Sequence, residues 1–151
     1  MEKREWPLAW WSEIAKKARD ASLPLVFSAG PGDRDQALLT ELKSLSPDSH
    51  FLPKTTCLGP FLAILARAGM FVGSDSGPFH FAVGLDTPSI GLFGPMLPER
   101  VAPLEGNFRT LVGGECTCCV HARTCTSPTP CIHGVSVGRL WEEINRVYII
   151  D

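Results

Sequence analysis

The sequence predicts an α/β fold in which an open parallel sheet carries helices on both faces. Short apolar runs typical of buried strands alternate with longer segments of helical periodicity. The chain has 151 residues, enough for one domain with its own core. Its composition, 44% hydrophobic and 20% charged, is that of a globular chain. We therefore expect a single domain over residues 1–151.

The first half of the chain is expected to alternate between helix and strand. Residues 7–21 form an amphipathic helix, because apolar side chains recur on one helical face. Residues 23–28 form a strand that ends in a turn rich in glycine and proline. A helix over 33–45, a short strand over 50–52 and a helix over 58–68 follow.

The second half continues the same alternation. Residues 70–72 read as a buried strand, 78–85 as a helix and 88–93 as the next strand. A further strand is expected over 108–112, and Ser136 is expected to cap a last helix. Connections between these parallel strands should be right-handed.

The turn at residues 73–77 carries the first functional indication. It is small and polar, and Pro78 after it suits the first helical turn, where a missing N–H costs nothing. Ser76 or Gly77 is then the N-cap. Free backbone N–H groups and the helix dipole at such a position bind anions. The sequence therefore predicts a phosphate-bearing ligand at the carboxyl end of a parallel strand.

Bulk properties exclude several classes of partner and location. A formal charge of -2 gives no reason to expect nucleic acid as a partner. No apolar run reaches the roughly 20 residues that a membrane span needs. The charged amino terminus lacks the apolar segment of a secretion signal. We therefore expect a cytoplasmic protein.

The cysteines form a separate feature. Five of the six lie within a stretch at residues 113–135 that we expect to be a loop. Cys116, Cys119, Cys125 and Cys131 could supply four thiolates to a structural zinc or iron ion. Free thiols or oxidised pairs are the competing interpretation.

Four segments of the chain resemble, in order and spacing, the lipopolysaccharide heptosyltransferases, which are family 9 glycosyltransferases. They are Arg4–Pro7, Ser28–Asp33, Ser74–His80 and Phe93–Pro95. The resemblance implies a Rossmann-like domain that is one half of a two-domain GT-B fold. It implies the carboxyl-terminal half, which binds a nucleotide-sugar donor, usually ADP-heptose.

The same resemblance implies that the other half of the enzyme is absent from this chain. In the family, the amino-terminal domain binds the acceptor, a lipopolysaccharide core or another glycan, and supplies an aspartate that acts as base. The chain would then hold no catalytic residue, and alone it would transfer little or no sugar. Transfer needs no cofactor, so a metal at the cysteines would be structural. The full-length enzyme is expected in the cytoplasm, with attachment to the inner membrane surface left open.

The resemblance also implies roles for four residues of the turn. Ser76 and Gly77 match the family's diphosphate contacts. Asp75 would bind donor-sugar hydroxyls, or the N–H groups of its own turn. His80 would contact the phosphate or brace the turn, and a buried histidine between two phenylalanines is the structural alternative.

Three further residues are implied at other points of the donor site. Arg4 stands near the family's lysine at the donor phosphates, although a chain start is also prone to fray. Gly30 and Asp33 follow a strand where a nucleoside could lie, but for Asp33 the sequence favours the structural role of a helix cap. Met96 and Leu97 stand where the family commonly has threonine and aspartate, which leaves the donor sugar open.

Two other functions remain open from the sequence alone. One is a nucleotide-sugar binding module without enzymatic activity. The other is an interaction domain held together by metal at its cysteines. A dehydrogenase is disfavoured, since no Gly-x-Gly-x-x-Gly follows the expected strands.

Overall fold

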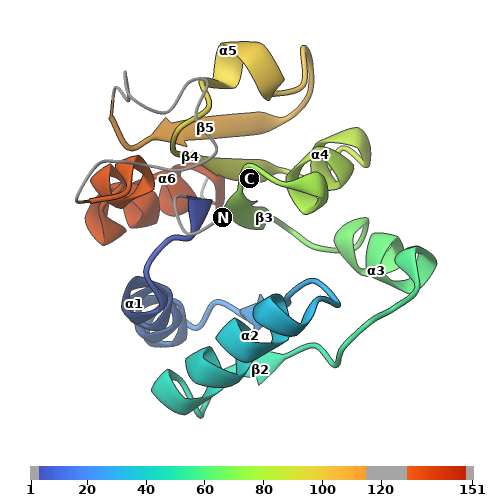
Figure 1. The fold of residues 1–151 in the computed structure, drawn as a ribbon, viewed down its shortest axis with the longest axis vertical. Coiled ribbons are helices and arrows are strands. Elements are labelled where there is room, and N and C mark those ends of the chain that lie inside the picture. Colours follow the sequence, from blue (N-terminus) through green and yellow to red (C-terminus); the bar gives the residue numbers. More distant parts are fainter. Residues whose placement is uncertain (1–3, 115–128, 149–151) are drawn as a thin grey trace. The chain divides into compact units, whose positions relative to one another are not determined.

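The chain folds as parallel strands flanked by helices, which confirms the α/β class (Figure 1). The computed structural model describes residues 4–114 and 129–148. It divides into two compact units. The small unit is Pro7–Phe61, and the large unit combines Met1–Trp6 with Leu62–Asp151. That residues 1–151 act as one domain stays a prediction.

The small unit contains two helices and a pair of parallel strands. Its elements are α1 (Leu8–Asp20), β1 (Val26–Phe27), α2 (Asp33–Leu45) and β2 (His50–Phe51). β1 pairs with β2 in parallel, so that Phe27 lies opposite Phe51 and their rings stack at 5.4 Å. Phe27 forms a buried cluster with Leu39 and Leu42 of α2. Helix α3 (Leu58–Leu65) spans the boundary between the units.

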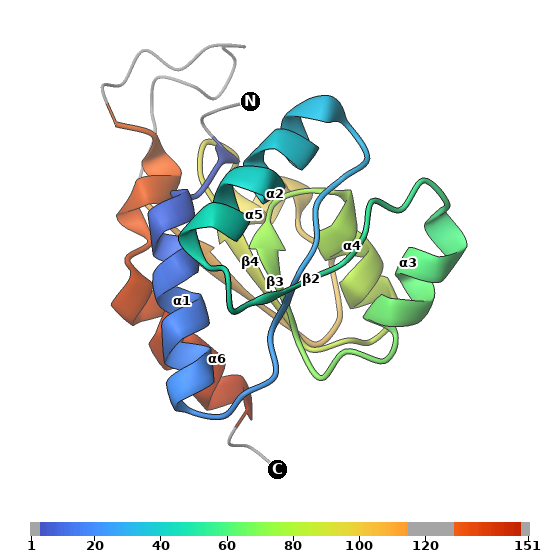
Figure 2. The same ribbon diagram turned by 90° about the horizontal axis from the view of Figure 1, so that it is seen from below.

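The large unit holds a three-stranded parallel sheet in the order β3-β4-β5. Its elements are β3 (Phe71–Ser74), α4 (Gly77–Gly84), β4 (Ser89–Phe93), α5 (Pro98–Val101), β5 (Phe108–Val112), the 3₁₀ helix η2 (Cys131–Gly134) and α6 (Val137–Tyr148). All five residues of the central strand β4 are buried. Helix α4 packs against β3 and β4 (Figure 2).

Phe79 fastens the first turn of α4 to the sheet. Its side chain is fully buried, and its ring meets those of Phe93 and Phe108 edge to face at 5.7 and 5.8 Å. Gly91 in β4 leaves the room for it, because a Cβ there would lie 2.8 Å from the Phe79 ring. The start of α4 is therefore held by the core.

Glu143 of α6 is a buried carboxylate with two arginine partners. Its side chain is 11% exposed and lies 3.6 Å from Arg109 Nε of β5 and 3.1 Å from Arg146 Nη1. Because burying an unpaired charge destabilises a fold, the two arginines lower the cost of burying the Glu143 carboxylate.

Two glycines bring the backbone after β5 against the backbone before α6. A Cβ on Gly134 would collide with the carbonyl group of Gly113, and one on Gly113 would collide with that of Cys131. The stretch predicted as a loop, 113–135, thus has closely held ends and includes the helix η2. Its residues 115–128 lie outside the described part.

Gly134→Ala is expected to destabilise the fold by about 1–3 kcal/mol, the usual cost of overpacking. The added methyl group has no space beside the Gly113 carbonyl, and backbone moves less easily than a side chain. Urea unfolding followed by circular dichroism measures the loss. Gly138→Ala in α6 is the matched control, because a Cβ there meets nothing within 4 Å. Equal stability of the two variants would contradict the predicted clash.

Most element predictions are confirmed within a few residues, and the differences have local causes. The strand expected over 23–28 is only Val26–Phe27. The helix expected over 58–68 ends at Leu65, after which the N–H groups of Arg67 and Ala68 bond three residues back. Helix α5 was not predicted. Ser136 caps α6 as expected, accepting a bond from the Arg139 N–H at 3.2 Å.

No helix within residues 4–114 and 129–148 is long and apolar enough to cross a bilayer.

Candidate anion-binding site

The predicted turn lies at the carboxyl end of β3, between Ser74 and Gly77. Neighbouring β4 runs parallel, with Ser74 opposite Leu92. The Asp75 N–H donates to the Leu92 carbonyl at 3.1 Å, so the turn is tied to the central strand as it leaves the sheet. This is the edge where open α/β sheets bind ligands.

Ser76 is the N-cap of α4, as predicted, but its hydroxyl does not cap the helix. The Oγ donates to the Ser74 carbonyl at 3.0 Å, while the Ser76 carbonyl accepts from the N–H groups of Phe79 and His80. Among the described residues, no protein acceptor is found for the N–H of Ser76 or Gly77. Two donors at the helix start are thus available to an anion.

Asp75 lies between two basic side chains, of which Arg4 comes from a distant part of the sequence. Its Oδ2 lies 3.7 Å from Arg4 Nη1, and its Oδ1 lies 3.5 Å from His80 Nε2. Asp75 is 11% exposed, whereas Arg4 is 46% and His80 39% exposed. The carboxylate is therefore mostly covered, and the Arg4 guanidinium and the His80 imidazole beside it reach solvent.

This arrangement decides two alternatives left open by the sequence. His80 is not a buried histidine between two phenylalanines, because much of its side chain is exposed and its ring meets only the edge of the Phe79 ring, at 5.5 Å, among the described contacts. Arg4 is not a frayed end. Trp6 is buried and its Nε1 donates to the Val135 carbonyl at 2.8 Å, which holds the chain start in the large unit.

The other two predicted donor residues belong to the small unit. Gly30 follows β1, and its carbonyl accepts a bond from Gln36 Nε2 at 2.7 Å. Asp33 is the first residue of α2 and is exposed, while the N-cap is Gly32, so the expected cap at Asp33 is wrong. Their part in the same site stays a prediction.

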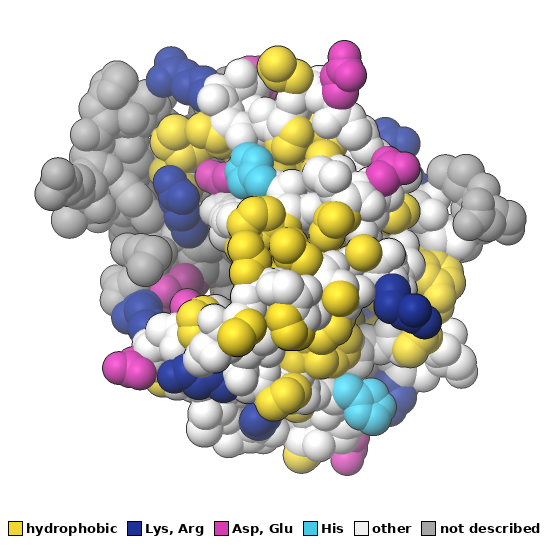
Figure 3. Space-filling view, turned by 90° about the vertical axis from the view of Figure 1, so that its right-hand side faces the viewer, with side chains coloured by type: hydrophobic (Ala, Val, Ile, Leu, Met, Phe, Trp, Pro, Cys, Tyr) yellow, Lys and Arg dark blue, Asp and Glu magenta, His cyan; other side chains and the backbone are white. Residues whose placement is uncertain are grey.

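Apolar side chains are exposed on the neighbouring helix surface. Phe81 and Leu85 at α4 and Ile64 on α3 are each 39% exposed. Figure 3 shows hydrophobic side chains gathered on the face that carries these helices. Exposed apolar side chains that lie together are typical of surfaces that contact another protein surface or a ligand.

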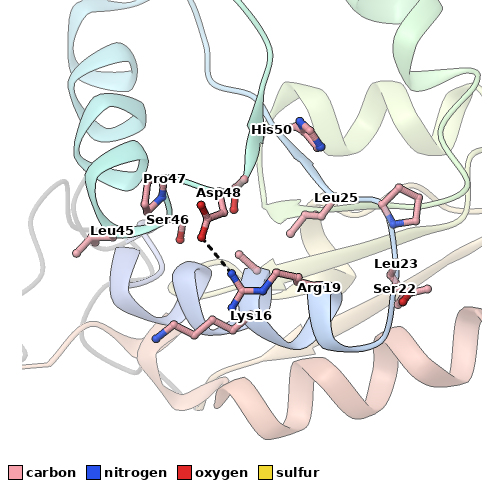
Figure 4. A pocket seen from close by; sticks show the side chains of 13 residues that line it. Lys16, Arg19, Ser22, Leu23, Leu25, Leu45, Ser46, Pro47, Asp48 and His50 are labelled. Atoms are coloured by element: carbon pink, nitrogen blue, oxygen red, sulfur yellow. Dashed lines mark hydrogen bonds and ion pairs between the residues drawn. The ribbon is translucent and has the colours of Figure 1, made fainter.

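A pocket of about 490 Å³ lies in the small unit, away from its predicted ligand edge. It is lined by the C-terminal ends of α1 and α2, by the segments that lead into β1 and β2, and by His50 at the start of β2 (Figure 4). Arg19 Nη1 pairs with Asp48 Oδ2 across it at 3.3 Å. No residue predicted for the site lines this pocket.

The predicted metal site falls mostly outside the described residues. Cys116, Cys119 and Cys125 lie there, and Cys131 is a partly buried thiol in η2. Within residues 4–114 and 129–148, no group of three or more potential ligands could hold a metal ion. A zinc or iron at the cysteines stays a prediction.

The sequence model of the family described as "Glycosyltransferase family 9 (heptosyltransferase)" matches residues 1–130. The chain belongs to this family. It is 28% identical over 104 residues to a lipopolysaccharide core heptosyltransferase, OpsX, of Haemophilus influenzae, covering 66% of the chain and 29% of that protein. It is 31% identical over 128 residues to lipopolysaccharide heptosyltransferase 1 of Pseudomonas aeruginosa, covering 82% of the chain and 34% of that protein. The chain thus spans about a third of the length of these relatives.

Solved structures of this family share the fold. A family 9 glycosyltransferase from Veillonella parvula superposes with a TM-score of 0.86 over 100% of this chain and 44% of its own, at 16% identity. The E. coli heptosyltransferase WaaC with ADP superposes with a TM-score of 0.76 over 97% of this chain and 41% of its own, at 20% identity. The same enzyme with ADP-2-deoxy-2-fluoro heptose superposes with a TM-score of 0.70 over 95% of this chain and 39% of its own, also at 20% identity.

Proposed function

We propose that this chain is the carboxyl-terminal, donor-binding half of a glycosyltransferase that takes ADP-heptose as donor. The observation that carries the proposal is the turn at Asp75–Gly77. It offers the unpaired N–H groups of Ser76 and Gly77 next to the half-exposed side chains of Arg4 and His80. The family membership supports the reaction, and the structures of WaaC with ADP and with an ADP-heptose analogue support the ligand class.

The chemistry assigned to this site is stabilisation of the leaving group. In the proposed transfer, an acceptor hydroxyl attacks the anomeric carbon of the donor and gives its proton to an aspartate base supplied by the rest of the polypeptide. A carbon–oxygen bond forms as the bond from that carbon to the diphosphate breaks. The electron pair stays on the diphosphate, where negative charge builds up. N–H donors fixed in advance and a nearby arginine stabilise that charge.

The residues of this chain indicate less about the identity of the donor sugar than about the diphosphate. Leu97 is the N-cap of α5 and 39% exposed, and Met96 precedes it after β4. These apolar side chains follow the strand beside β3, at the same sheet edge as the turn. Heptose is the sugar we propose. We place the full-length enzyme in the cytoplasm at the inner membrane surface, acting on a lipopolysaccharide core or a related glycan.

Nucleotide binding is tested by thermal unfolding of the chain with ADP, UDP, GDP or CDP. ADP at 100 times its Kd should stabilise the fold by about 2.7 kcal/mol and raise the Tm by several degrees. Adenosine is the control, since it keeps the base and ribose but has no phosphate for the turn. If none of the four diphosphates changes the Tm, the proposal fails. A response to adenosine equal to that of ADP would place binding away from the turn.

A further inference from the structure

The role of Asp75 can be inferred from the way its two oxygens are used. A carboxylate that binds sugar hydroxyls needs accessible oxygens. Here Oδ2 faces Arg4 and Oδ1 faces His80, and the side chain is only 11% exposed. Little carboxylate surface is left for a ligand. The groups that remain accessible are the Arg4 guanidinium and the His80 imidazole.

The position of Asp75 beside an anion site also needs compensation. A carboxylate next to the N–H groups of Ser76 and Gly77 would repel a diphosphate. The positive charge of Arg4 offsets that repulsion. The contacts of Asp75 with Arg4 and His80 also limit the rotamers of two side chains that would otherwise be free at the surface, and restricting an arginine before binding reduces the entropy lost when a ligand binds.

We propose that Asp75 is a positioning residue, which holds Arg4 and His80 beside the N–H groups of Ser76 and Gly77 so that the guanidinium and the imidazole both meet the donor diphosphate. This inference rests on the proposed function. It differs from the role that the family resemblance implies for Asp75, because the carboxylate acts through its two partners and not on the sugar.

The sign of one change in affinity separates the two roles. Asp75→Asn keeps the shape of the side chain and removes its charge. If Asp75 only bound sugar, losing a negative charge near the phosphates would leave ADP affinity equal or higher. If Asp75 positions Arg4 and His80, ADP affinity falls, by about three- to tenfold for the loss of one ordered arginine contact.

The experiment is a double-mutant cycle with ADP, which has no sugar to transfer. Calorimetric Kd values are measured for the wild type, Asp75→Asn, Arg4→Ala and the double variant. We expect the double variant to bind ADP about as weakly as Arg4→Ala, because without the arginine the carboxylate has less to position. Wild-type or higher affinity in Asp75→Asn, or losses that simply multiply in the double variant, overturn the proposal.

Glu143→Gln is the matched control. Glu143 is equally covered and also pairs with two cationic side chains, but it lies on α6. It should lose stability without losing ADP affinity. If Asp75→Asn does not fold, Arg4→Ala and His80→Ala are measured in its place. Both side chains are half-exposed, so their removal should leave the fold intact. Unchanged ADP affinity in these two variants overturns the positioning role. Failure of the wild type to bind ADP overturns the proposed function itself, and the positioning role with it.

Discussion

Phe79→Ala is expected to lower the free energy of unfolding by about 3–5 kcal/mol, the typical cost of removing a buried aromatic ring. The ring is fully buried and contacts Phe93 and Phe108 edge to face. It lies in the first turn of α4, and its N–H bonds to the Ser76 carbonyl at 3.1 Å. The variant should therefore loosen the candidate site together with the core.

Urea unfolding of Phe79→Ala and Phe81→Ala tests this expectation. Phe81 lies on the same helix but is 39% exposed, so its removal should cost much less. Phe79→Leu should fall between the wild type and the alanine variant, because it retains apolar volume at the site. Similar losses for the two alanine variants would show that the core does not depend on Phe79 as described.

Gly77→Ala is expected to weaken ADP binding at least tenfold while the fold stays intact. A Cβ at Gly77 would meet only Phe81 Cε2, at an ordinary 3.7 Å, so the protein has room for it. The methyl group instead stands at the backbone that an anion must approach. A hydrogen bond to a charged group contributes roughly 1.5–3 kcal/mol, which corresponds to a tenfold change or more.

Gly84→Ala provides the comparison at the other end of α4. A Cβ there meets nothing within 4 Å, and the residue is far along the helix from the turn. Calorimetric titration with ADP should give a wild-type Kd for Gly84→Ala and a raised Kd for Gly77→Ala. Wild-type affinity in both variants would move the nucleotide away from the start of α4.

The sequence predicted elements well where local chemistry decides them. The strand Phe108–Val112 was predicted to the residue, and α4 and β4 within one residue. The strand over 23–28 was overextended, because Pro24 has no N–H to donate to a neighbouring strand. Helix α5 was missed because four residues, Pro98–Val101, are too few to show a period.

The same distinction holds at the candidate site. Ser76 and Gly77 could be found from the sequence, because a turn of small residues before a proline fixes its own backbone geometry. The pairing of Arg4 with Asp75 could not, since it depends on Trp6 being held at Val135 across most of the chain. The family resemblance supplied Arg4 as a candidate, but only the fold shows what it contacts.

The contact between Gly113 and Gly134 has a consequence for how the last helix is attached to the sheet. Because the backbones of these two glycines meet, the end of β5 and the segment before α6 are held together by direct contact. A side chain at either position would force the two backbones apart and would move α6 relative to β5. The attachment of α6, and with it the ion pair of Glu143 with Arg109, thus depends on two residues that have no side chain.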